Sequence, residues 1–175
     1  MKLSKDSQLA SLKIPYLPMV IEEAFAVLCW QSGKITEAVG HWTIEGLANK
    51  ARLPIEGVMQ RLKEIEVMSD GIEIEGEELA NLLKIKNDRI YLLDVREPWE
   101  FTLAHIAGSH LMARTDLAQI FEGLKELTVV TICHHGIRSL SAALYLREAG
   151  LPRVHSLRGG LDAWSLDVDP KTPRY

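Results

Sequence analysis

Hydrophobic residues in the second half of the chain form short runs that alternate with segments of helical periodicity. The runs over residues 90–95 and 129–132 are almost wholly apolar, as is typical of parallel strands buried on both faces. Further strands are expected over residues 72–75 and 154–157, and helices over residues 77–85, 116–124, 139–149 and 161–166. Because strands and helices alternate, the pattern predicts an α/β fold with a doubly wound parallel sheet and helices on both faces.

The first half of the chain shows helical periodicity without strands. Pro18 is well placed for the first turn of a helix over residues 19–31. Two further helices are expected over residues 43–51 and 55–67, separated by a three-residue turn that ends in Pro54. Their apolar faces are predicted to be buried through Ile44, Leu47, Ile55, Val58, Leu62 and Ile65. This arrangement is typical of a small helix-turn-helix or winged-helix unit.

The turn Ser69-Asp70-Gly71 separates these two patterns. We therefore predict a helical module over residues 1–70 and an α/β domain over residues 71–175. The first part has eight basic and nine acidic residues, a net charge of −1, and the second a net charge of −3. Because neither part has a cationic surplus, DNA binding is not expected, and docking of a protein partner or self-association through residues 1–70 is favoured.

Cysteine usage and hydropathy narrow the setting. The sequence has two cysteines, Cys29 and Cys133, and no CxxC pair. A disulfide scaffold is therefore not expected, and we expect the protein to work in a reducing compartment. Cys29 ends an apolar helical face and is interpreted as a core thiol. The apolar stretch of residues 14–30 is broken by prolines and glutamates, which argues against a signal peptide or a spanning helix. We expect a cytoplasmic protein with no membrane association.

The candidate chemistry lies where the run over residues 129–132 ends in Cys133 and a helical pattern follows. A cysteine at the carboxyl end of a parallel strand, facing the start of a helix, lies where ligands bind in open α/β sheets. Unpaired N–H groups of the loop and of the first helical turn stabilise an anion there, which favours the thiolate. Gly136 allows a tight turn, and Arg138 adds a permanent positive charge.

Cys133-His134-His135-Gly136-Ile137-Arg138-Ser139 resembles the active-site loop of rhodanese-type sulfurtransferases. Three further blocks resemble the same family and occur in its order: residues 93–101, 105–109 and 159–164. The resemblance covers about residues 72–175. Alanines stand at positions 104 and 107, beside His105-Ile106, where the family usually has Gly and Pro.

The resemblance implies a rhodanese-like fold and a sulfurtransferase that carries sulfur as a persulfide on Cys133. The donor would be thiosulfate or a persulfide, the acceptor a thiol or a protein, and no cofactor beyond the covalent persulfide would be needed. The loop residues would bind the substrate anion. Residues 168–175 also resemble the ending of rhodanese modules that are fused to adenylyltransferases of the ubiquitin-activating type.

Loop length separates sulfur transfer from phosphate chemistry. Cys133 and Arg138 have the spacing Cys-x4-Arg, whereas related phosphatases use Cys-x5-Arg. The backbone N–H groups of such a loop form a ring around the bound group. A ring that is one residue shorter is expected to enclose a persulfide sulfur better than a phosphate tetrahedron.

Several nearby residues are assigned supporting roles. The resemblance to the family implies a structural ion pair between Arg96 and Glu100, and Asp94 is interpreted as an acceptor that fixes its loop. Arg158 leaves the last strand beside the catalytic loop and is a candidate for the substrate mouth. His134 and His135 are placed for an electrostatic role, but adjacent side chains diverge and lack further ligands, so no metal site is expected.

Two other functions remain open. The α/β domain could dock a partner without catalysis, with the helical module setting specificity, although the nucleophile in the loop favours an enzyme. The protein could also be a sulfur- or redox-responsive regulator whose helical module touches DNA.

Overall fold

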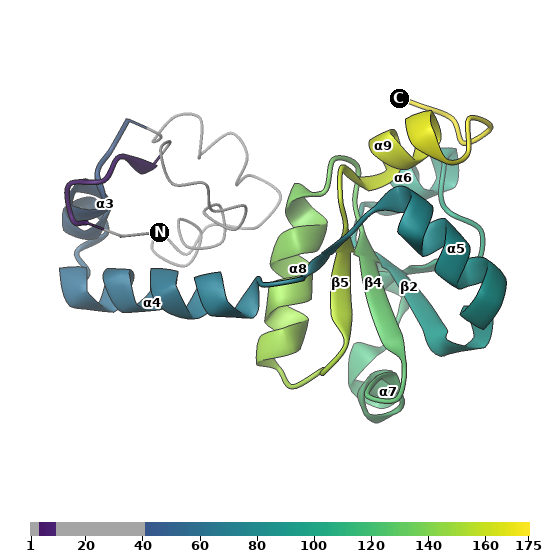
Figure 1. Cartoon of the computed structure of the whole chain (residues 1–175), viewed down its shortest axis with the longest axis horizontal. Coiled ribbons are helices and arrows are strands. Elements are labelled where there is room, and N and C mark those ends of the chain that lie inside the picture. The colour runs from purple at the N-terminus through teal and green to yellow at the C-terminus, as the bar shows by residue number, and fades with distance from the viewer. Residues whose placement is uncertain (1–3, 10–40) are drawn as a thin grey trace. The chain divides into compact units, whose positions relative to one another are not determined.

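The computed structural model describes residues 4–9 and 41–175, in two compact units, Met1–Asp70 and Gly71–Tyr175 (Figure 1). Each unit is considered by itself. The helix expected over residues 19–31 and the position of Cys29 lie outside the described residues.

The first unit contains the two helices predicted around Pro54, α3 (Ile44–Ala51) and α4 (Ile55–Met68). Thr43 caps α3, since its hydroxyl oxygen accepts a hydrogen bond from the Gly46 N–H at 3.0 Å. The turn between the helices has a left-handed residue, Arg52, with φ 57°. The predicted apolar face is buried at Ile44, Leu47, Val58, Leu62 and Ile65, whereas Ile55 is half-buried.

The second unit is built on a five-stranded sheet in the order β1-β5-β4-β2-β3. Every neighbouring pair is parallel, which confirms the predicted α/β class. The strands are β1 (Glu73–Ile74), β2 (Ile90–Asp94), β3 (His110–Leu111), β4 (Thr128–Ile132) and β5 (Val154–Leu157). The apolar run over residues 129–132 thus lies in the central strand, with β5 on one side and β2 on the other.

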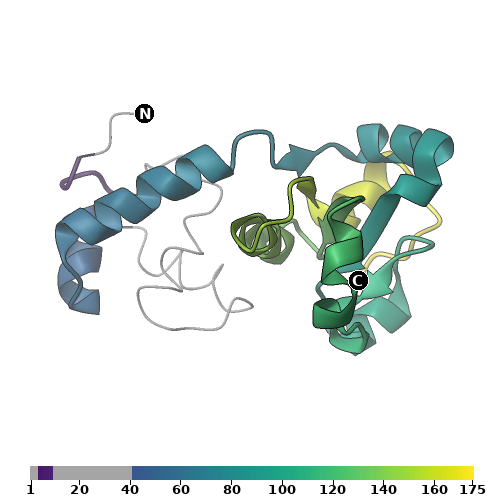
Figure 2. The ribbon, with the colours of Figure 1, turned by 90° about the horizontal axis from the view of Figure 1, so that it is seen from below.

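Helices cover both faces of this sheet (Figures 1 and 2). α5 (Gly76–Lys86) and α9 (Gly160–Asp167) pack on one face, where Leu79 and Trp164 join the core around Val130 and Ile132. α8 (Ile137–Glu148) packs on the other face against β4 and β5. Since side chains alternate along a strand, even-numbered residues of β4 face α5 and α9 and odd-numbered residues face α8. The remaining elements are the 3-10 turns η3 (Asn87–Arg89) and η4 (Met112–Arg114) and the helices α6 (Pro98–Leu103) and α7 (Leu117–Leu124).

Two short elements were not predicted, namely α6 and β3. A six-residue helix has fewer than two turns, and a two-residue strand has no alternation, so hydrophobic periodicity cannot reveal either. α8 begins at Ile137, two residues before the expected start, because the glycine before it already makes the turn.

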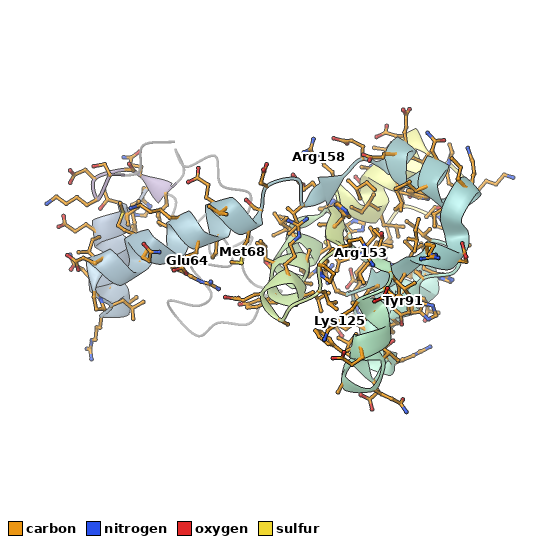
Figure 3. All side chains as sticks on the ribbon, turned by 60° about the horizontal axis from the view of Figure 1, so that its bottom comes forward. Glu64, Met68, Tyr91, Lys125, Arg153 and Arg158 are labelled. Carbon is orange, nitrogen blue, oxygen red and sulfur yellow. The ribbon has the colours of Figure 1, made fainter. Side chains whose placement is uncertain are left out.

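The two edges of the sheet have different roles. At the amino ends of the strands, Arg153 donates to the Lys125 carbonyl at 2.7 Å and joins the segments that precede β5 and β4 (Figure 3). At the carboxyl ends, β4 runs into Cys133 and β2 into Asp94. The candidate site therefore lies at the carboxyl edge, as expected for a parallel sheet.

Candidate active site

Cys133 follows β4 directly, and only three residues separate it from the first residue of α8. Gly136 makes this turn possible with φ 89°, a conformation that favours glycine. A Cβ at this position would also lie 3.0 Å from the Gly159 backbone nitrogen. The loop is therefore held close to the segment that leaves β5, and residue 136 has to be glycine.

The sulfur of Cys133 faces two hydrogen-bond donors, one in this loop and one in the first turn of α8. The Gly136 N–H donates to Sγ at 3.1 Å, and the Ser139 hydroxyl lies 3.3 Å from Sγ. Cys133 is only 1% exposed. Donors preorganised around a buried sulfur are the arrangement that a negatively charged sulfur requires.

Two further hydroxyls hold Ser139 in place. Ser156 of β5 donates to Ser139 Oγ at 2.9 Å, and Thr131 of β4 donates to the Ser139 carbonyl at 2.7 Å. Thr131 and Ser156 are partners in strand register and face α8, and all three residues are fully buried. The chain of hydroxyls thus connects the interior of the sheet with the sulfur.

The carbonyl side of the loop is held by the first turn of α9. The Leu161 N–H donates to the Cys133 carbonyl at 2.8 Å, and the Asp162 N–H donates to the His134 carbonyl at 3.0 Å. Gly160 permits this approach, because a Cβ there would collide with both carbonyl groups. N–H groups in the first turn of α9, which have no acceptor within the helix, therefore fix the backbone of the loop.

Arg138 forms a two-pronged ion pair with Glu100 of α6. Its Nη1 and Nη2 atoms lie 2.8 and 2.7 Å from the two carboxylate oxygens. Burial alone would raise the pKa of Glu100, but hydrogen bonds from Arg138 and from the Glu97 N–H lower it to about 2. The Glu100 hydrogen bonds correspondingly raise the pKa of Arg138. This ion pair, the Arg138–Glu100 clamp, ties α6 to the first turn of α8 beside the sulfur.

The expected ion pair between Arg96 and Glu100 is wrong. Arg96 instead pairs with Asp94, with 2.6 Å between Nη2 and Oδ2, and both side chains are fully buried. It also donates to the Ala104 carbonyl at 2.7 Å. Asp94 is only two residues away and points into the same turn, whereas the carboxylate of Glu100 faces α8. As expected, Asp94 also accepts from the Arg96 backbone N–H, at 3.0 Å.

Residues 75–167 match the family of the rhodanese-like domain. The chain belongs to this family. Thiosulfate sulfurtransferase GlpE of Tolumonas auensis is 33% identical over 98 residues, which are 55% of this chain and 91% of that protein. The probable adenylyltransferase/sulfurtransferase MoeZ of Mycobacterium tuberculosis is 34% identical over 91 residues, 50% of this chain and 23% of that protein. A solved protein from Rhodopseudomonas palustris, described as a possible tyrosine phosphatase, shares the fold with a TM-score of 0.50. It is 23% identical, and the match covers 63% of this chain and 89% of that one.

Two histidines follow the cysteine of this rhodanese loop, and the structure separates their environments. His134 is half-buried, and its buried Nδ1 atom has no hydrogen-bond partner. Burial, reinforced by the neighbouring His135, lowers the pKa of His134, which keeps this ring neutral near pH 7. His135 is exposed, and its Nδ1 atom lies 4.0 Å from Asp162.

Arg158 lies at the end of β5, and its guanidinium is engaged beside β1 (Figure 3). It forms ion pairs with Glu75 and, at 3.3 Å, with Glu73. The structure thus brings Cys133, Gly136, Arg138 and Ser139 together and supports them through Asp94 and Arg96, while the charge of Arg158 is compensated at the β1 edge.

The rhodanese site also uses residues that the sequence did not single out, namely Thr131, Ser156 and Tyr175. One feature of the sequence could have pointed to Thr131 and Ser156, namely a hydroxyl side chain between apolar neighbours in a strand. No sequence feature pointed to Tyr175, because its contacts depend on how the last residues fold back.

Within the described residues, no three histidine, cysteine, aspartate or glutamate side chains gather in a group that could hold a metal ion. No described helix is both long and apolar enough to cross a membrane.

Proposed function

We propose that this protein is a sulfurtransferase that carries sulfane sulfur as a persulfide on Cys133, from a donor such as thiosulfate to a thiol or protein acceptor. The observation that carries the proposal is the hydrogen bonding at the sulfur, where Gly136 and Ser139 both face Sγ. The curated relatives named as sulfurtransferases support the same chemistry.

The first half-reaction consumes the donor. The Cys133 thiolate attacks the outer sulfur of thiosulfate, the S–S bond of the donor breaks, and sulfite leaves with its electron pair. The Gly136 N–H and the Ser139 hydroxyl then stabilise the persulfide sulfur atoms. Because the leaving group takes the electron pair, no external oxidant or reductant is needed.

The second half-reaction regenerates the enzyme. A nucleophile such as cyanide or a thiolate attacks the terminal sulfur, and the electron pair of the Cys133 S–S bond returns to the thiolate. No cofactor enters either step in this proposal. Cys133 has to be a free thiolate to attack the donor, so we place the reaction in the cytoplasm, where thiols are kept reduced.

We propose that residues 1–70 supply protein docking or self-association. The two described helices bury one apolar face against each other, and the segment carries a net charge of −1, which supports a protein partner over nucleic acid. A non-catalytic docking module remains the second candidate, favoured by the 1% exposure of Cys133.

Replacement of the nucleophile separates these functions. In Cys133→Ser, transfer of sulfur from thiosulfate to cyanide should be abolished, because a serine hydroxyl without a dedicated base is a poor nucleophile. The matched control is Cys29→Ser, which should retain activity and should still gain about 32 Da, one sulfur atom, after incubation with thiosulfate. Substantial transfer by a folded Cys133→Ser protein would reject the proposal, and a wild type that takes up no sulfur would favour the docking module.

A further inference from the structure

The last residues of the sequence fold back toward the catalytic loop. Thr172 donates to the Asp169 carboxylate at 3.0 Å, and Arg174 donates to Asp162 of α9 at 2.8 Å. Asp162 lies in the helical turn that holds the loop carbonyls. The segment is therefore tied at positions 172 and 174, and these ties place Tyr175 beside Glu100 and the catalytic loop.

The hydroxyl of Tyr175 lies between the two buried ion pairs. It accepts a hydrogen bond from Arg96 Nη1 at 2.7 Å and donates to Glu100 Oε1 at 3.1 Å. Burial raises the pKa of Tyr175, so the phenol keeps its proton at neutral pH and remains a donor. One hydroxyl thus connects the Asp94–Arg96 pair with the Arg138–Glu100 clamp, and the tip of the ring is fixed.

The ring itself packs against the residue that follows the nucleophile. The centroids of the Tyr175 and His134 rings are 4.4 Å apart. The ring of Trp99, from α6, meets the Tyr175 ring edge-on, with 6.0 Å between the centroids. Tyr175 and Trp99 are 42% and 61% exposed, whereas Cys133 is almost inaccessible. Three partly exposed aromatic rings, called here the aromatic rim (Trp99, His134 and Tyr175), therefore gather beside the buried sulfur's loop, to which His134 belongs.

We propose that Tyr175 is a specificity-determining residue that limits the width of molecules able to reach Cys133. The fixed ring admits narrow sulfur compounds, such as an inorganic sulfane donor or an extended thiol, and excludes a bulky ring system. Only the identity of the natural substrate rests on the proposed function. Access to the sulfur is a property of the native protein and can be measured without sulfur transfer.

The test compares two thiol reagents of different width on full-length protein. Iodoacetamide is the narrow reagent and a pyrene maleimide the wide one, and Cys29→Ser is the background, so that only Cys133 reacts. Tyr175→Ala should raise the rate with the maleimide about tenfold relative to iodoacetamide, equivalent to roughly 1.4 kcal/mol of barrier. Tyr175→Phe keeps the ring and should change this ratio less than about twofold.

The matched control is Tyr145→Ala, which removes a tyrosine of nearly equal exposure, 43%, from a later turn of α8. It should leave the ratio unchanged. Tyr175→Leu is a second variant, which keeps an apolar side chain in case the alanine variant is unstable, and it should shift the ratio in the same direction.

The proposal is overturned if the Tyr175 variants accelerate both reagents equally, since that would reflect a loosened loop, or if they change neither rate. These outcomes are independent of sulfur transfer. A wild type without transferase activity could still show the width selectivity, and an active enzyme could lack it.

Discussion

The hydroxyl of Ser139 has one hydrogen to donate, and two acceptors compete for it, the Cys133 sulfur at 3.3 Å and the Gly136 carbonyl at 3.1 Å. Ser156 donates a hydrogen bond to the Ser139 hydroxyl oxygen. This bond restricts the directions in which the hydrogen of the Ser139 hydroxyl can point. The orientation of a catalytic donor is thus decided by a buried serine on a neighbouring strand.

Ser156→Ala is therefore expected to weaken the donor without touching the loop. Losing one buried hydrogen bond should cost about 1 kcal/mol of unfolding free energy, and alkylation of Cys133 by iodoacetamide should slow about threefold. A slower reaction separates this effect from a general loss of stability, because a loosened structure would expose the buried sulfur and accelerate alkylation. Ser165→Ala is the control, since this buried hydroxyl donates to the Leu161 carbonyl within α9. Identical alkylation rates for the two variants would reject the role of Ser156.

Between elements, the Arg138–Glu100 clamp joins two helices that are far apart in sequence. Glu100 has a pKa of about 2 in the folded protein against an ordinary value of 4.5. A lowered carboxyl pKa stabilises the fold fully above pH 4.5, and this stabilisation is lost as the pH falls toward 2. The shift corresponds to about 3 kcal/mol.

Glu100→Gln should lower the free energy of unfolding by about 3 kcal/mol at pH 7, because it leaves the Arg138 charge unpaired in a mostly buried position. The difference from the wild type should shrink steadily below pH 4.5, as measured by urea unfolding at several pH values. Glu122→Gln is the control, since this carboxylate is exposed and pairs with Lys125 on the surface, so its effect should stay below about 0.5 kcal/mol. A pH-independent difference for Glu100→Gln would contradict the assigned linkage.

The loop between β4 and α8 is also expected to exclude phosphate. Its ring from Cys133 to Arg138 is one residue shorter than in phosphatases, and the charge of Arg138 is already compensated by Glu100. Hydrolysis of p-nitrophenyl phosphate should therefore be no faster than in Cys133→Ser, the matched blank. Turnover that depends on Cys133 and approaches the rate of sulfur transfer would show that loop length does not discriminate.

At the scale of the whole molecule, Cys133 and the described groups that hydrogen-bond to it all belong to the second compact unit, Gly71–Tyr175. A fragment that begins at Gly71 is expected to fold and to keep sulfur transfer from thiosulfate within about threefold, because every hydrogen bond described at Cys133 lies inside it. Removal of residues 1–70 should change the oligomeric state or the choice of acceptor, which light scattering and acceptor kinetics would detect. A folded but inactive fragment would mean that both units build the site.

The same segment is expected to bind random duplex DNA only weakly. Each phosphate contact needs a cation to displace a counterion, and residues 1–70 carry no cationic surplus. Gel-shift titration at low salt measures this with the full chain. Tight binding that weakens steeply with salt would replace docking with a DNA-linked regulatory function.

The sequence by itself determined the parallel α/β fold, its family and the position of Cys133 between a buried strand and a helix start. These features are local, because a buried strand, a cysteine, a turning glycine and a helix start are consecutive in the chain and constrain one another directly. The same holds for the helix pair around Pro54, where a capping threonine and an apolar period lie within a few turns.

Only the tertiary structure decided which charges pair and which groups surround the sulfur. Glu100 and Arg138 are 38 positions apart, and Arg96 and Tyr175 are 79 apart. Their contacts depend on where a six-residue helix and a folded-back segment come to rest, and no periodicity encodes that. The resemblance to the rhodanese family favoured Glu100 as the partner of Arg96, but the turn after β2 pairs Arg96 with Asp94 and leaves Glu100 free to hold Arg138 beside Cys133.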